Sequence, residues 1–341
     1  MPADSGQVTS LVERPGVDGN PRYSPDGQVI AFESMGGEKI WSFRFDVWTM
    51  PAEGGPPKKL SHTPNRLTGI VEWAQDGESL LATDAHHMST HIYEIPVDAD
   101  KVTQLSTGDG LYSDASYSSS ADRLAFVYQN SSKAPEVHLS SKNNFSRQQI
   151  SQRNADKPKP AMGKTELITW TAPDGTTIEG LLTYPVGYNK NDQVPLILDI
   201  HGGPQGVHNH SFIRNILISQ YFAEHGYATL RPNPRGSIGY GFDFRSAIDG
   251  NWGVGDIQDQ LSGVDNLIKQ RVVHPDSLAI WGPSYGGYMT AYMITQTDRF
   301  KAAMMAAAGT NLISDIGTTD IPDWQIAQMG GPYWDNLRSL Y

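Results

Sequence analysis

An internal repeat fills the first half of the sequence and restricts the fold more than any other feature. Three segments align with one another, and each is typical of a strand, a tight turn and a second strand: residues 23–32, 73–82 and 117–126. A second series supports the period, because a strand-like run ends at Leu60, Leu105 and Ile150, which are spaced by 45 residues. Several short strands in a period of about 45 residues indicate the blades of a β-propeller.

We expect about three blades in residues 1–158. The dipeptides Asp26-Gly27 and Asp76-Gly77 favour the turns between strands, since these residue types tolerate positive φ. Residues 7–12 predict the last strand of an earlier blade. Closed propellers use about 4–8 blades, so the sequence predicts a propeller fragment with open edges.

Composition limits the class of protein. A chain of 341 residues suits about two domains, and a net charge of -11 argues against nucleic-acid or anionic-membrane partners. Cysteine is absent, which excludes disulfides, thiolate metal sites and a cysteine nucleophile. The first residues lack the basic and apolar regions of a signal peptide, and no apolar run approaches the ~18 residues of a membrane span. These features favour the cytoplasm and predict no membrane contact.

A polar, proline-containing segment at 152–164 indicates the domain boundary, which gives a second domain at 162–341. Strands alternate with helices in this domain, so we expect an α/β fold with a parallel sheet. The expected strands are 165–170, 178–184, 194–200, 227–230, 278–281 and a buried 301–308. The expected helices are 212–224, 257–270 and 288–297.

Ser284 lies between Gly282 and Gly286 in a G-x-S-x-G pattern, with an apolar strand before it and a helix-forming run after it. This pattern is typical of a nucleophile elbow, a strained turn at which side chains on the flanking glycines would collide with neighbouring backbone. We therefore expect Ser284 to present its hydroxyl to a substrate.

A His-Gly-Gly-Pro loop at 201–204 follows the third strand of the second domain, which is the expected place of an oxyanion loop. The backbone N–H of Tyr285, directly after the nucleophile, would be the second donor. His201 precedes Ser284 and lies on the oxyanion side, so we expect it to position the loop and not to act as the general base.

The general base is missing from the sequence. The triad order of this fold is Ser, then Asp or Glu, then His, yet the last histidine of the chain is His274. The acids after the elbow include Asp315, Asp320, Asp323 and Asp335, and without a later histidine none can be assigned a triad role.

Three other patterns invite functional interpretations. His86, His87 and His91 suggest a metal site, but their spacing matches no standard ligand pattern and a hairpin should not place all three on one face. Residues 235–241 resemble a phosphate cradle but lack the Lys-Ser/Thr of a P-loop, so we expect a loop at the rim of the site. Asp256 and Asp259 open a helix, where capping is favoured over catalysis.

Four motifs together resemble the prolyl oligopeptidase family, in its acylaminoacyl-peptidase and dipeptidyl-peptidase-like branch: residues 201–204, 233–241, 252–256 and 282–287. The resemblance implies that Ser284 is the nucleophile and that the N–H groups of Gly203 and Tyr285 form the oxyanion hole. It also implies a triad Asp and His beyond residue 341. We therefore expect a chain truncated at both ends, whose α/β-hydrolase domain lacks its last strands and helices.

The expected function is a serine peptidase that cleaves short peptides through an acyl-enzyme on Ser284, with no cofactor and no metal. In the family that the chain resembles, the propeller admits short peptides and excludes folded proteins. Two alternatives stay open, a carboxylesterase and an inactive fragment that only binds a partner. The sequence also leaves three questions open: which substrate side chain is preferred, whether the enzyme is an exopeptidase or an endopeptidase, and what its oligomeric state is. An oligomer is possible.

Overall fold

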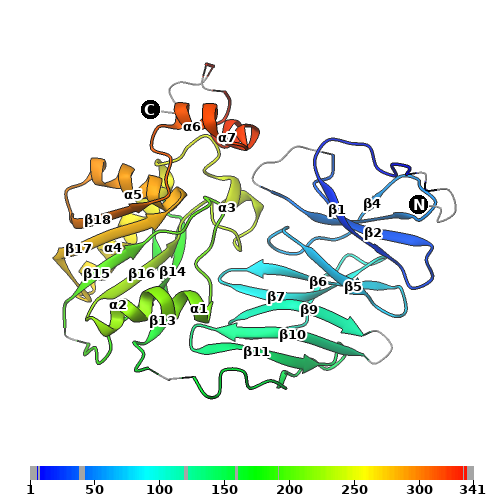
Figure 1. Cartoon of the computed structure of the whole chain (residues 1–341), viewed down its shortest axis with the longest axis horizontal. Helices are drawn as coiled ribbons and strands as arrows, with labels where there is room; N and C mark the ends of the chain where they lie inside the picture. Colours follow the sequence, from blue (N-terminus) through cyan, green and yellow to red (C-terminus); the bar gives the residue numbers. More distant parts are fainter. Residues whose placement is uncertain are drawn as a thin grey trace.

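The computed structural model describes residues 6, 8–37, 43–118, 122–157, 160–190, 192–332 and 334–335. Figure 1 shows two halves side by side, an all-β half formed by the early strands and a half in which helices cover a central sheet. No helix within these residues is both long and apolar enough to cross a membrane.

Each copy of the repeat folds into four antiparallel strands. The strands are β1 (Asp18–Tyr23), β2 (Val29–Ser34), β3 (Asp46–Pro51), β4 (Lys58–Lys59), β5 (Gly69–Trp73), β6 (Ser79–His86), β7 (Ser89–Pro96), β8 (Thr103–Gln104), β9 (Leu111–Ser118), β10 (Arg123–Asn130), β11 (Lys133–Ser140) and β12 (Gln148–Gln149). The first copy forms one sheet in the order β1-β2-β3-β4, and the other two copies join where β7 meets β9. The repeat therefore predicted these strands correctly, although residues 119–121 of the third copy lie outside the described residues.

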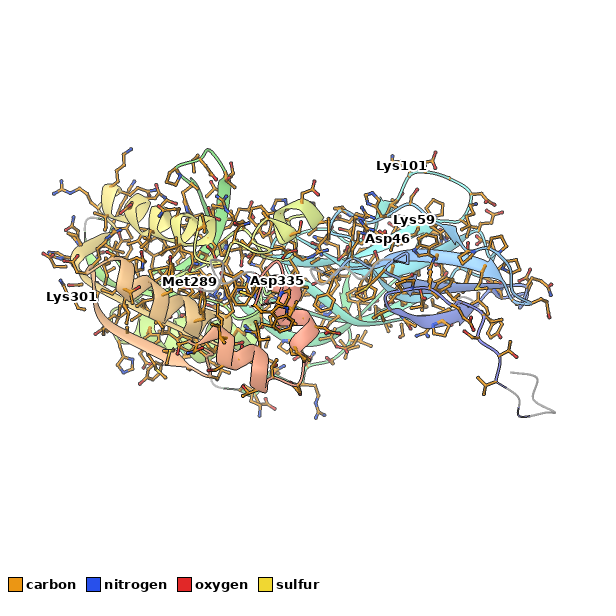
Figure 2. The ribbon with its side chains drawn as sticks, turned by 90° about the horizontal axis from the view of Figure 1, so that it is seen from above. Asp46, Lys59, Lys101, Met289, Lys301 and Asp335 are labelled. Carbon is orange, nitrogen blue, oxygen red and sulfur yellow. The ribbon has the colours of Figure 1, made fainter. Side chains whose placement is uncertain are left out.

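The turns and the core of this half follow from the sequence pattern. Gly27 and Gly77 adopt φ of 73° and 71° in the predicted turns. Alternating side chains of the long strands build a core that includes Leu80, Ala82 and Ile95. Asp46 forms an ion pair with Lys59 at 2.8 Å, and both side chains are labelled in Figure 2.

The prediction of a strand at residues 7–12 is wrong for residues 8–12. These residues adopt no regular structure, because no neighbouring strand pairs with their backbone. Residue 7 lies outside the described part of the chain.

The second half contains a sheet in the order β13-β14-β16-β15-β17-β18. Its strands are β13 (Thr165–Thr171), β14 (Thr177–Thr183), β15 (Val194–Asp199), β16 (Ala228–Asn233), β17 (Val273–Pro283) and β18 (Phe300–Ala306). The expectation of a parallel sheet is only partly correct. β13 and β14 pair antiparallel through the tight turn at Asp174-Gly175, whereas the four later strands run parallel because helices connect them.

Helices cover both faces of this sheet. They are α1 (Phe212–Arg214), the π-helix η2 (Asn215–Gln220), α2 (Tyr221–Glu224), α3 (Phe242–Ser246), α4 (Gly255–Lys269), α5 (Tyr285–Gln296), α6 (Leu312–Thr318) and α7 (Pro322–Gln328). α4 and α5 bury Val264, Leu267 and Met289 against one face, which makes the main core of this half. The sequence predicted the long helices and missed the short α3, α6 and α7.

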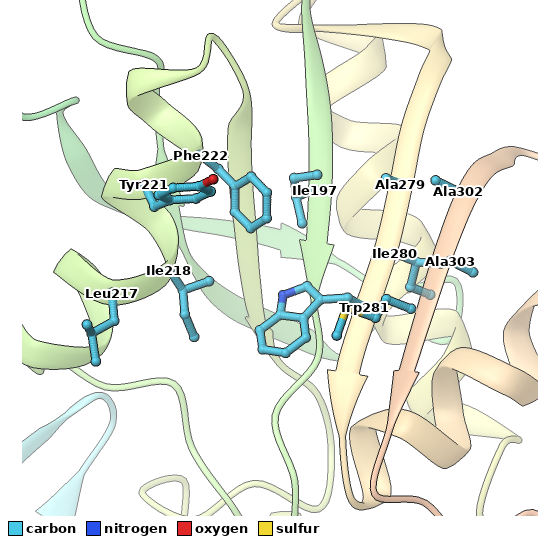
Figure 3. Close-up of a pocket in the computed structure, with 11 residues that line it drawn as sticks. Ile197, Leu217, Ile218, Tyr221, Phe222, Ala279, Ile280, Trp281, Ala302 and Ala303 are labelled. Carbon is cyan, nitrogen blue, oxygen red and sulfur yellow. The ribbon is translucent and has the colours of Figure 1, made fainter.

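The last strand, β18, is mostly exposed, so the prediction of a buried strand is wrong. An apolar groove of about 360 Å³ lies beside it, on the sheet face opposite α4. Figure 3 shows Trp281 of β17 in this groove, between Ile218 on one side and Ala303 of β18 on the other. The alanines and methionines of β18 therefore face open space and not a core.

The two halves are joined by specific hydrogen bonds. The hairpin between β6 and β7 contacts the loop before α3, since the His87 N–H donates to the Gly239 carbonyl at 2.7 Å. The Gly239 N–H in turn donates to Asn65 Oδ1 at 2.8 Å. Arg245 of α3 is fully buried and donates to the Asn65 carbonyl at 2.9 Å and to the Phe43 carbonyl at 2.5 Å. These bonds fix the first half over the carboxyl ends of the sheet strands.

Candidate active site

Ser284 occupies the turn between β17 and α5, with φ 57° and ψ -126°. Its N–H donates to the Ala306 carbonyl at 2.9 Å, and its carbonyl accepts from the N–H groups of Gly287 and Tyr288 at 2.9 and 3.0 Å. The residue is exposed, whereas Pro283 before it is half-buried and Tyr285 after it is buried. The sequence prediction of a strained elbow that presents the hydroxyl thus agrees with the local geometry.

The flanking glycines leave no room for a side chain. A Cβ on Gly286 would lie 2.2 Å from the Ile200 carbonyl oxygen, and one on Gly282 would lie 2.6 Å from the Gly286 backbone. A Cβ on Gly287 would lie 2.6 Å from the Ala306 oxygen. The turn is therefore pressed against the ends of β15 and β18, and this contact requires glycine.

The 201–204 loop lies directly beside Ser284. A Cβ on Gly202 would come within 3.3 Å of the Ser284 Cβ. Gly203 is exposed and adopts φ of 135°, a conformation that favours glycine. Tyr285 begins α5, where an N–H has no partner within the helix. The structure thus brings the loop and the helix N-terminus together at Ser284, an arrangement that an acyl-transfer site requires.

His201 is buried, and both of its ring nitrogens have hydrogen-bond partners other than Ser284. Its Nδ1 donates to the Gly202 carbonyl at 2.8 Å, and its Nε2 lies 3.0 Å from the Ser237 hydroxyl. Burial lowers the pKa of His201 to about 4, so the ring is neutral near pH 7. These contacts fit the positioning role that the sequence predicted for this residue.

No described histidine hydrogen-bonds the Ser284 hydroxyl, and none of the acids after the elbow pairs with a described histidine. Asp320, Asp323 and Asp335 are exposed. Asp315 belongs to α6, and its carboxylate lies near Gly309 in the preceding loop. The location of the triad acid and histidine therefore stays a prediction.

Sequence analysis missed one contact beneath the nucleophile. The Tyr285 hydroxyl donates a short hydrogen bond to Asp256, which also accepts from the N–H groups of Gly253 at 3.2 Å and Ile257 at 3.0 Å. The edge of the Trp252 ring packs on Tyr285 with centroids 4.9 Å apart. Asp256 thus accepts backbone N–H groups at the start of α4, as a capping residue would, and additionally binds the residue that follows Ser284.

The loop at 235–241 is held by charge and lies near the site. Arg235 donates to both carboxylate oxygens of Asp259, at 2.9 and 2.7 Å, and pairs with Asp174 at 2.7 Å. The predicted capping role of Asp259 is therefore incomplete, because its carboxylate is the buried partner of Arg235. The Ser237 hydroxyl of the same loop contacts His201, so the loop supports the oxyanion side.

The three histidines of the β6–β7 hairpin lie closer together than the sequence suggested. Ring centroids are 4.7 Å apart for His86 and His87 and 6.3 Å apart for His86 and His91. The register places His86 and His91 diagonally on one face of the strand pair, whereas His87 lies in the turn, which agrees with the expectation that a hairpin should not place all three on one face. Within the described residues no group of three or more His, Cys, Asp or Glu has the arrangement of a metal site.

A cavity of about 490 Å³ opens beside Gly203, between the two halves. Its wall is largely apolar and is formed by Phe43, Phe45, Leu67, Gly203, Gln205, Ile238, Arg245, Ile321 and Trp324. The groove of Figure 3 contains neither Ser284 nor Gly203, so it is not the candidate site.

Comparison with known proteins finds similarity to one peptidase family. The prolyl oligopeptidase family matches residues 214–341, which include the elbow, α4 and the loop at 235–241. The part of the chain that contains Ser284 is thus similar to the prolyl oligopeptidase family. The chain is 39% identical over 166 residues, 47% of its length, to the uncharacterized peptidase YuxL of Bacillus subtilis, of which it covers 25%.

Longer matches extend over both halves. The chain is 27% identical to dipeptidyl-peptidase 5 of Porphyromonas gingivalis over 97% of its own length and 48% of that protein. Among solved structures, the acylaminoacyl peptidase of Pyrococcus horikoshii matches with a TM-score of 0.78 and 22% identity, over 92% of this chain and 49% of that one. The chain thus spans about half the length of these relatives, or less, and shares their fold.

Proposed function

We propose that this chain is part of a serine peptidase that hydrolyses short peptides, with Ser284 as nucleophile. The observation that carries the proposal is the strained, exposed Ser284 with the Gly203 loop beside it. The Ser284 oxygen would attack the peptide carbonyl carbon, and the N–H groups of Gly203 and Tyr285 would stabilise the oxyanion. The C–N bond then breaks, the amine leaves with a proton, and water hydrolyses the acyl-enzyme.

The proton transfers require a histidine, and we predict that it lies beyond residue 341 together with the triad acid. The order of the triad in this fold supports this placement. The domain boundary near 158–162 and the assignment of β1–β12 to about three propeller blades are parts of the same proposal. The similarity to acylaminoacyl and dipeptidyl peptidases supports both.

The apolar cavity beside Gly203 supports peptides with a large apolar side chain as substrates. A side chain that entered the cavity would meet Phe45, Leu67 and Trp324 next to the reacting carbonyl. Apolar lining near a few polar groups is typical of substrate pockets. The carboxylesterase and partner-binding alternatives gain no specific support from the site.

The first prediction concerns reactivity. The natively expressed protein should gain the mass of one adduct on treatment with a fluorophosphonate, and Ser284→Ala should gain none, because only an activated serine reacts. Intact mass spectrometry measures both the adduct and the length of the polypeptide. Labelling that persists in Ser284→Ala, or no labelling of the native protein, would overturn the proposed function.

A substrate comparison separates the peptidase from the esterase. We expect blocked peptide anilides with a large apolar residue to be cleaved, and Ser284→Ala to abolish the cleavage. Turnover of short acyl esters alone would favour the carboxylesterase.

A further inference from the structure

The buried contact between Asp256 and Tyr285 lies at the back of the candidate oxyanion hole. We propose that Asp256 is a positioning residue for acyl transfer, which acts through the Tyr285 hydroxyl to hold the Tyr285 N–H in its place. This inference rests on the proposed function. It gives a role to a carboxylate on α4 that does not itself touch the substrate.

The environment of Asp256 indicates that its position matters. The side chain is fully buried and, among the described residues, forms no ion pair. Burying a carboxylate without a cation is costly, and three hydrogen bonds offset the cost here. Burial raises the pKa of Asp256, whereas the Tyr285 hydroxyl and the two N–H groups act in the opposite direction. Arg235 is bound to Asp259 of the same helix instead.

The backbone at Ser284 needs such a constraint. A φ of 57° is unfavourable for serine and persists only where several contacts enforce it. One constraint is the hydrogen bond from Ser284 N–H to Ala306. The Tyr285 side chain supplies a second, because its hydroxyl is bound to α4 and its ring is packed against Trp252.

The peptide plane between Ser284 and Tyr285 connects this anchor to the chemistry. The Tyr285 N–H belongs to that plane, so a fixed Tyr285 Cα limits how far the N–H can rotate. An oxyanion donor is effective only when it points to the place where charge develops. Loss of the hydrogen bond between Tyr285 and Asp256 should therefore reduce the stabilisation of the transition state more than it reduces the affinity for the substrate.

The test is a double-mutant cycle with Asp256→Asn and Tyr285→Phe in the natively expressed protein. Both changes nearly preserve side-chain volume. We expect each to lower kcat by about tenfold, as loss of a hydrogen bond to a charged group does. The KM for a peptide anilide should change by less than about twofold, since the oxyanion forms only in the transition state. The double variant should be no slower than the slower single variant, because both changes break one connection.

A matched control separates positioning from stability. Val264→Ala removes buried volume from the same helix, about two turns beyond Asp256, and leaves the hydrogen bond between Asp256 and Tyr285 intact, so it should lower the melting temperature and leave kcat within about twofold. Unchanged kcat in Asp256→Asn, or effects of the two changes that multiply, would overturn the inference while the peptidase proposal stands. A native protein without Ser284-dependent labelling or turnover would overturn both.

Discussion

The backbone conformation of Ser284 depends on the absence of side chains at the neighbouring glycines. Three carbonyl or backbone groups lie where a Cβ on Gly282, Gly286 or Gly287 would be. The pattern of glycines in the sequence was sufficient to predict this turn, since the requirement is local. The pairing of Tyr285 with Asp256 could not be predicted in this way, because the two residues come from different helices and neither belongs to a pattern that specifies the other.

Gly286→Ala should disrupt the elbow. The new methyl would overlap the Ile200 carbonyl, which is backbone and cannot move aside, so we expect a loss of about 3 kcal/mol in the free energy of unfolding. Fluorophosphonate labelling should disappear as well. Denaturant unfolding and intact mass spectrometry measure the two effects.

Gly317→Ala is the control for this change. Gly317 lies in α6, a Cβ there meets nothing within 4 Å, and alanine should stabilise the helix by about 0.5–1 kcal/mol. A Gly286→Ala protein with native stability and labelling would contradict the proposed cause of the elbow geometry.

At the scale of elements, the β6–β7 hairpin links the halves through a titratable pair. His87 Nδ1 lies 3.0 Å from Glu179 Oε2, and the Tyr240 hydroxyl donates to the same oxygen at 3.1 Å. The hydrogen bond to Glu179 raises the pKa of His87 above its ordinary value of 6.5, although partial burial of the ring opposes protonation. The pair is partly exposed, so its contribution is modest and sensitive to salt.

This pair predicts a pH dependence of stability. Because the folded pKa of His87 exceeds the unfolded one, its contribution is complete below about pH 6.5 and is lost as the pH rises through the folded pKa. The melting temperatures of the wild type and of Glu179→Gln should therefore converge between about pH 6 and pH 8.

The exposed Glu53→Gln is the control, and its melting temperature should run parallel to that of the wild type across this range. If the difference in melting temperature between the wild type and Glu179→Gln stayed constant across this pH range, the hairpin would be held by the uncharged hydrogen bonds alone.

The sequence predicted whether a segment is a helix or a strand better than it predicted which other segments cover it. The strand at β18 was predicted from its run of apolar residues, but burial depends on what covers a strand, and that information is not in the strand itself. The short helices α6 and α7 were missed for a related reason, since two turns give too little periodicity to distinguish a helix from a loop. The histidines of the hairpin came together because the strand register, which the sequence did not specify, places them so.

At the scale of the whole molecule, the cavity beside Gly203 has walls from both halves. Phe43, Phe45 and Leu67 come from the first half, and Ile321 and Trp324 come from the segment after β18. The sequence predicted the two folds and the turn at Ser284, but not this cavity, because its lining comes from loops that meet only in the folded chain.

Phe45→Ala should therefore lower the affinity for peptides, although Phe45 belongs to the first half of the chain and Ser284 to the second. Removing an aromatic side chain from the wall loses about 1.5–3 kcal/mol of apolar contact, so the KM for substrates with a large apolar residue should rise about tenfold or more. Fluorophosphonate labelling of Ser284 should be unchanged.

Tyr23→Ala is the matched control, since Tyr23 is an exposed aromatic residue of β1 that does not line the cavity. Its KM should equal that of the wild type. An equal KM in Phe45→Ala would show that substrates bind elsewhere.

Because both halves line the cavity, the proposed enzyme would place its reactive serine and part of its substrate pocket on different halves of the chain. In the proposed peptidase, reactivity would depend on the turn at Ser284, whereas discrimination among substrates would depend in part on Phe43, Phe45 and Leu67, more than two hundred positions earlier in the chain. Substitutions in the first half could then alter which peptides are cleaved without disturbing the strained turn that cleaves them. The division allows selectivity to diverge among related proteins while the chemical step is preserved.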